Sequence, residues 1–77
     1  MTKVDLEKAI QAVLGDEVYR ALVSSEVSLP FRLNHAVSHA FVHEVGTQEQ
    51  RAVLREAAKN LEEHGHFMFD NDSKVSP

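Results

Sequence analysis

The sequence predicts an all-α domain, a small bundle of four helices followed by a short C-terminal tail. Apolar residues recur at three- and four-residue intervals, which is the period of an amphipathic helix, and no segment sustains the alternation of a strand. Gly15, Gly46 and Gly65 each follow a segment with this helical period, as expected of glycine just past a helix end. The predicted helices cover residues 3–14, 17–23, 30–45 and 48–64.

The first helix, residues 3–14, is predicted to begin at Thr2, which with Asp5 forms a weak version of the Ser/Thr-x-x-Glu capping box. One arc of the helical wheel carries its apolar side chains, which should face the core. They are Leu6, Ala9, Ile10, Val13 and Leu14. Asp16 is predicted to cap a second, short helix over residues 17–23.

The third helix, residues 30–45, is predicted to follow Ser28, a suitable N-cap residue, with Pro30 in the first turn, where proline costs no helical hydrogen bond. This helix is apolar almost all round, which is more than one neighbouring helix can cover. We therefore expect a second face of the helix to contact a partner. The residues predicted for that face are Phe31, Phe41, Val42 and Val45.

The fourth helix, residues 48–64, has the clearest start in the chain, because Thr47 and Gln50 form a full capping box. Its charges separate by side, with a basic flank and an acidic flank on either side of the apolar stripe. The basic flank consists of Arg51, Arg55 and Lys59. We expect this flank to join the predicted interface and to face an acidic surface of the partner.

The predicted domain ends after a short apolar segment, residues 67–69, which should fold back over the helices. Residues 1–69 are thus predicted to form a single helical domain, and residues 70–77 a polar, flexible tail.

Length and composition favour a soluble domain that gains stability from a second copy. A domain of 77 residues buries only about 60% of the surface that its unfolded chain exposes, and the chain contains no cysteine that could form a disulfide. We therefore expect a homodimer. The net charge of −4 makes nucleic acid an unfavourable partner, and no apolar run or signal pattern indicates a membrane, so we expect a cytoplasmic protein.

These observations predict a small acidic interaction module that regulates or inhibits a larger protein. We do not expect an enzyme, because four short helices rarely enclose a walled pocket and no nucleophile motif is present. No cofactor is expected on this hypothesis.

The first alternative is a protein that binds zinc or nickel, or senses metal or pH, through histidines. His35, His39 and His43 recur every four residues, and His39 with His43 could hold one ion. The outer two of the three are roughly 11 Å apart along a helix, so one ion cannot bind all three. Further ligands could come from His35, His64 or His66.

The second alternative is a DNA-binding regulator that resembles a helix-turn-helix domain only in having short helices joined by glycine turns. Arg51, Arg55 and Lys59 would then contact phosphates. Glu62 projects into the same sector and disfavours this hypothesis.

Overall fold

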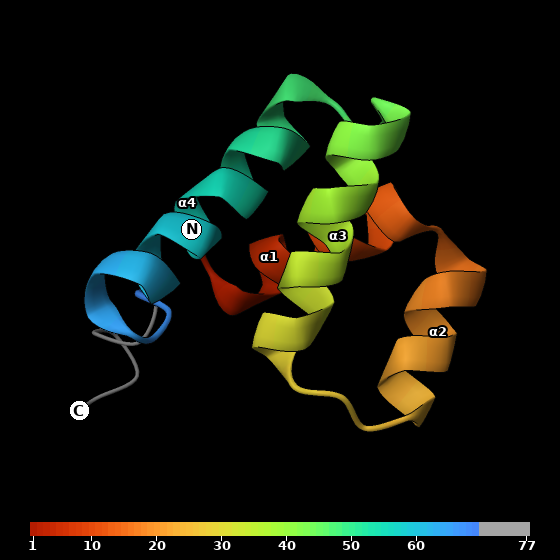
Figure 1. The fold of residues 1–77 in the computed structure, drawn as a ribbon, viewed down its shortest axis with the longest axis horizontal. Helices are drawn as coiled ribbons and strands as arrows, with labels where there is room; N and C mark the ends of the chain where they lie inside the picture. The colour runs from red at the N-terminus through yellow and green to blue at the C-terminus, as the bar shows by residue number, and fades with distance from the viewer. Residues whose placement is uncertain (70–77) are drawn as a thin grey trace.

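The computed structural model describes residues 1–69 and confirms the predicted all-α fold (Figure 1). Within the described residues the helices are α1 (Lys3–Leu14), α2 (Asp16–Ser24), α3 (Leu29–His43) and α4 (Gln48–His64). The predicted tail, residues 70–77, lies outside the described part of the chain.

Helix α1 is the centre of the fold and packs against each of the other three helices (Figure 1). The core joins α1, α3 and α4, and all five side chains predicted for the inner arc of α1 are buried. The core residues are Leu6, Ala9, Ile10, Val13, Leu14, Leu33, Ala36, Ala40, Leu54 and Ala57. Four of these ten are alanine, which allows the helices to approach closely but contributes little apolar area. The core is therefore thin.

Side-chain caps fix the starts of three helices. The predicted weak cap at Thr2 is a full capping box, in which the Asp5 backbone N–H donates to Thr2 Oγ1 and the Thr2 N–H donates to Asp5 Oδ2, both at 3.1 Å. Thr47 and Gln50 form the second predicted box. Ser28 caps α3 as predicted. These bonds satisfy backbone donors that a helix start leaves without partners.

The end of the third helix was predicted wrongly. Helix α3 stops at His43, two residues before the predicted end, because Glu44 takes the left-handed conformation with φ of 52°. Glu44, and not Gly46, is thus the residue that ends this helix. Gly46 serves a different purpose: its φ is 95°, and a Cβ there would lie 3.0 Å from Val13 Cγ2. The α3–α4 turn therefore packs directly on α1.

The start of the second helix also differs from the prediction. Asp16 is the first residue of α2 and not its cap, which is Gly15. The Asp16 carboxylate instead accepts a hydrogen bond of 2.8 Å from Gln11 Nε2 of α1. No residue of α2 is fully buried; Tyr19 and Leu22 pack against the core from its edge. Helix α2 is therefore the least enclosed element of the described fold.

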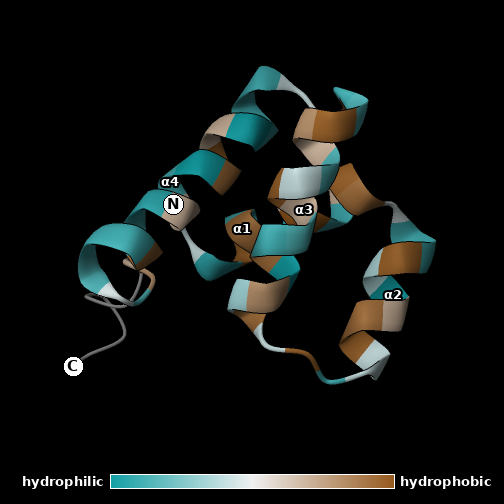
Figure 2. Ribbon diagram, viewed as in Figure 1, coloured by the Kyte–Doolittle hydropathy of each residue, from teal (hydrophilic) through white to brown (hydrophobic). Residues whose placement is uncertain are grey.

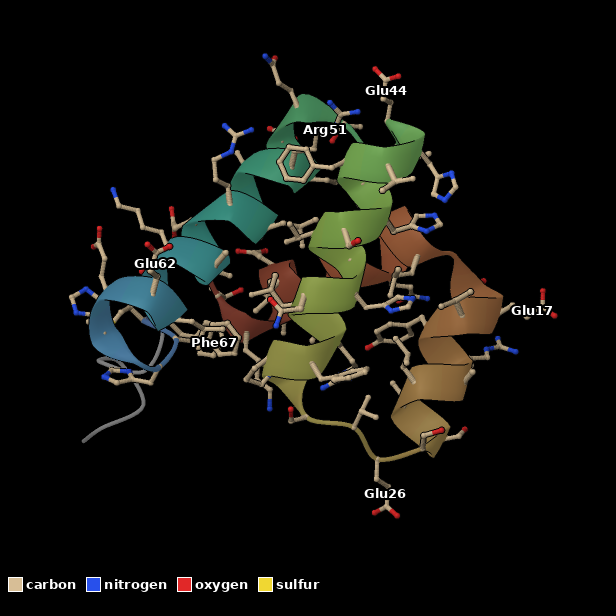
Figure 3. The ribbon with its side chains drawn as sticks, in the orientation of Figure 1. Glu17, Glu26, Glu44, Arg51, Glu62 and Phe67 are labelled. Carbon is tan, nitrogen blue, oxygen red and sulfur yellow. The ribbon has the colours of Figure 1, made fainter. Side chains whose placement is uncertain are left out.

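The segment after α4 folds back as predicted. Phe67 and Phe69 pack against the core, and their rings stack with centroids 5.4 Å apart (Figure 3).

Hydropathy along the ribbon agrees with this arrangement, since the first turns of α4 are hydrophilic and the visible part of α1 carries both hydrophobic and hydrophilic segments (Figure 2). Each helix within residues 1–69 is too short or too polar to span a lipid bilayer.

Candidate partner-binding face

Helix α3 carries large apolar side chains on the sides that the rest of the chain leaves uncovered. Its buried side consists of Leu33, Ala36 and Ala40. Phe41 is 70% exposed, and on the side away from the core Phe31 is 53% exposed and Val42 is 71% exposed. Exposed aromatic and aliphatic groups of this size on one helix are typical of a contact surface for another protein.

Val45 does not belong to this exposed surface, although the sequence placed it there. It lies beyond the end of α3, is half-buried and packs against the core. Its carbonyl oxygen accepts a hydrogen bond of 3.2 Å from Arg51 Nε. Val45 therefore helps to fix the start of α4 and to position Arg51. The error follows from the early end of α3, since the helical wheel does not apply beyond His43.

Three of the predicted interface residues meet at one groove between α3 and α4. This groove has a volume of about 180 Å³. Its lining consists of Val37, Ala40, Phe41, Arg51, Leu54, Arg55 and Ala58. The floor is apolar, Phe41 forms one wall, and the two arginines flank the α4 side. In Figure 3 the labelled Arg51 lies where the end of α3 approaches the first turns of α4.

The two arginines make the groove electropositive. Arg51 uses Nε for the Val45 carbonyl, which holds its side chain while its terminal N–H groups stay available. No carboxylate among residues 1–69 forms an ion pair with Arg51 or Arg55. The groove therefore combines an apolar floor with two guanidinium groups that can bind a carboxylate.

Lys59 and Phe31 lie apart from the groove, although both were predicted for the same interface. Lys59 Nζ pairs with Glu63 Oε2 of the next helical turn at 3.9 Å, in an exposed position. Phe31 is near the first turn of α3, ten residues and about 15 Å along the helix from Phe41. The residues predicted for one interface therefore lie mainly on two separate surfaces, the groove and the outer side of α3.

The five histidines include two pairs with neighbouring rings, and the tighter pair is His39 and His43. Their ring centroids are 4.5 Å apart on successive turns of α3. His64 and His66 form a separate pair, with centroids 6.3 Å apart. That pair follows the far end of α4, about 24 Å along the helix axis from the α3–α4 turn.

The predicted additional ligands His64 and His66 are therefore too distant to share an ion with His39 and His43. His35 remains two turns from His43. No three histidine, aspartate or glutamate side chains of residues 1–69 converge in a way that could hold a metal.

Four residues of the groove were not among those predicted for the interface, namely Val37, Ala40, Leu54 and Ala58. Val37 and Ala58 lie between the buried side of the helix and a predicted interface residue, so their neighbours on the helical wheel were the available signal, whereas Ala40 and Leu54 are themselves buried. A second feature gave no such signal. Arg32 of α3 pairs with Glu7 of α1, Nη2 to Oε1 at 3.9 Å, and this contact depends on how the helices pack.

Comparison of the chain with protein-family models, with curated proteins and with solved structures finds no match. The groove and the outer side of α3 are therefore the features of the molecule that indicate a function.

Proposed function

We propose that this protein is a small helical interaction module that works as a homodimer and binds a larger protein at the α3–α4 groove. The observation that carries the proposal is the groove itself, where the exposed Phe41 lies beside an apolar floor and two guanidinium groups. Regulation or inhibition of the larger protein is the activity that fits a module of this size, because the bound segment would be covered while the module stays on it.

The size of the groove favours a protein segment over a small molecule. Small-molecule sites usually enclose roughly 300–1,000 Å³. The volume here, about 180 Å³, suits one or two side chains of a partner. An amphipathic helix is the matching occupant, since its apolar side chains would enter the groove and its carboxylates would meet Arg51 and Arg55.

Binding of designed helical peptides tests this proposal. The probe is a peptide of about 16 residues, with leucine on one face and glutamate on its flanks, long enough to form a helix on binding. A matched peptide carries lysine in place of glutamate. We expect the acidic peptide to perturb the amide NMR signals of Val37, Leu54 and Ala58, and the basic peptide to leave them unchanged.

Charge reversal at the groove supplies the control. Arg55→Glu should weaken binding of the acidic peptide by about tenfold, because it removes one guanidinium and adds a like charge. Arg20→Glu makes the same change at an exposed position of α2, outside the groove, and should leave the affinity within twofold. Equal binding of the acidic and the basic peptide would contradict the proposal.

One observation favours a second candidate function, metal binding, and it is the proximity of the His39 and His43 rings. Imidazoles one turn apart on a helix can hold a single zinc or nickel ion. The other positions would be filled by water or by another molecule, since residues 1–69 bring no third ligand to this pair.

The DNA-binding alternative has less support. Of its three phosphate contacts, Lys59 pairs with Glu63, and the net charge of −4 disfavours a polyanionic partner.

A further inference from the structure

The outer side of α3 carries a second exposed surface, apolar at both ends and polar at its centre, that does not include the groove. Its residues are Phe31, His35, Ser38 and Val42, at successive spacings of four, three and four, and all four are exposed. Alternation of four and three is the spacing of the a and d positions of a coiled coil. The core residues Leu33, Ala36 and Ala40 occupy the opposite side of the same helix. We call these four exposed residues the outer seam.

The outer seam matches itself when a second copy of α3 runs antiparallel. With a two-fold axis midway between His35 and Ser38, Phe31 faces Val42 of the second copy and His35 faces Ser38 of the second copy. Each of these contacts then occurs twice, which closes the assembly at two chains. The aromatic and aliphatic ends pack together, and the central imidazole and hydroxyl can form a hydrogen bond.

A parallel pairing of the two α3 helices would fit the outer seam less well. In a parallel arrangement, Phe31 would meet Phe31 and His35 would meet His35, so Phe31 would lose Val42 as its partner and the imidazole would lose the Ser38 hydroxyl. The antiparallel arrangement also places each helix N-terminus beside a C-terminus, which the helix dipoles favour. No charged side chain occupies the outer seam, so a second copy buries no unpaired charge.

We propose that a second copy of this chain covers the outer seam, with the two α3 helices antiparallel. This inference rests on the proposed function, because it assigns the surface through which the homodimer forms and leaves both α3–α4 grooves to the larger protein. Helix α3 is already ordered by its own domain, so the association pays little for helix formation. The thin core supports the same assignment, since pairing covers apolar side chains that one chain leaves exposed.

Disulfide trapping tests the orientation, because the chain has no cysteine of its own. Phe31→Cys and Val42→Cys are prepared separately and oxidised mildly, either alone or as an equimolar mixture. The antiparallel pairing predicts a mixed disulfide between the two variants, identified by its intact mass under denaturing conditions, and little disulfide-linked protein when either variant is alone. Arg20→Cys, on the exposed side of α2, measures the yield from random collision.

Two results would overturn the inference. One is a mixture in which the mixed disulfide does not exceed the collision yield of Arg20→Cys. The other is stronger trapping of each variant with itself, which a parallel pairing would give. Far-ultraviolet circular dichroism of the reduced variants ensures that folded proteins are compared.

Sedimentation of full-length variants gives an independent measurement. Val42→Glu should reduce the mass from that of a dimer to that of a monomer, because two carboxylates would enter the outer seam. Val4→Glu is the matched control, since Val4 is also exposed but lies on α1. An unchanged dimer for Val42→Glu would contradict the inference. The acidic peptide should still bind this variant, so a failed dimer and a failed groove are distinguishable.

Discussion

At the scale of single residues, backbone conformation at the α3–α4 turn depends on Glu44 and Gly46. Both have positive φ, and the turn they form brings Gly46 within contact of Val13 on α1. A side chain is tolerated at Glu44 because it points away from the fold into solvent (Figure 3). At Gly46 the positive φ disfavours a side chain, and a Cβ would in addition lie 3.0 Å from Val13 Cγ2.

Gly46→Ala should therefore destabilise the protein more than Gly65→Ala. Both substitutions impose the cost of positive φ, about 1 kcal/mol, but only the methyl group at position 46 collides with Val13. A Cβ at position 65 meets nothing within 4 Å. We expect a total loss of about 2–3 kcal/mol for Gly46→Ala, measured by urea unfolding. Equal losses for the two variants would show that the turn can move away from α1.

The cap of α1 gives the stability a dependence on pH at the acid end. Hydrogen bonds from the Thr2 backbone N–H and then the Thr2 side chain lower the pKa of Asp5 from its usual 3.8. Because the pKa is lower in the folded chain, this stabilisation is present above the usual value and is lost as the pH falls through the folded pKa.

Asp5→Asn should thus be less stable than the parent protein at neutral pH, and the difference should shrink as the pH falls below about 4. Urea unfolding of both proteins along a pH series measures it. Glu26→Gln serves as the control, since Glu26 points into solvent from the α2–α3 loop (Figure 3). A difference that stays constant to pH 2 would refute the role of the charged carboxylate.

At the scale of helices, α2 differs from the other helices in its cap and in its contacts with the core. Its N-cap, Gly15, offers no side chain, and it has no fully buried residue. Tyr19 and Leu22 supply its apolar contacts with the core. Local stability follows the number of such contacts, so α2 should open more readily than α1 or α4.

Hydrogen exchange should therefore be fastest in α2. We expect the amides of Asp16–Ser24 to lose protection at lower urea concentrations than those of α1, which lies at the centre of the core. Leu22→Ala should lower the urea concentration at which α2 loses protection, with little effect on α1 and α4. Simultaneous exchange of α1 and α2 in the parent protein would instead indicate a single cooperative unit.

Local signals were sufficient to predict most of the helices, because caps and periodicity act over one or two turns. The Thr47 capping box and the buried arc of α1 are examples, and both are present in the structure. The end of α3 was missed because Glu44, which is not glycine, adopts a left-handed conformation there. The groove was missed in part because its shape depends on the packing of α3 against α4, which no single helix encodes.

At the scale of the whole molecule, the two exposed surfaces differ in charge. The α3–α4 groove carries two arginines and the outer seam carries no charged residue, which is why we propose an acidic helix for the groove and a second copy for the seam. The His39–His43 pair is a third feature, and it favours metal binding as a different function of the protein. Addition of metal distinguishes the metal-binding function from the two proposed protein contacts.

The proposed function predicts that zinc or nickel at micromolar concentration leaves the melting temperature of the metal-free protein unchanged. A bound ion would raise it, since a ligand that binds only the folded state stabilises that state. His39→Ala distinguishes a specific site from general binding, and His64→Ala is the matched control from the separate histidine pair. A rise that His39→Ala abolishes and His64→Ala preserves would favour the metal-binding function.

The small number of large buried side chains has a consequence for the lifetime of the protein. Leu6, Ile10 and Leu33 are the largest fully enclosed groups, and losing one such side chain typically costs about 2–5 kcal/mol, comparable to the whole stability of many small domains. We therefore expect the free chain to spend measurable time unfolded and open to proteases. Occupied chains would then outlive free ones, so the abundance of this protein in a cell should track the abundance of its target.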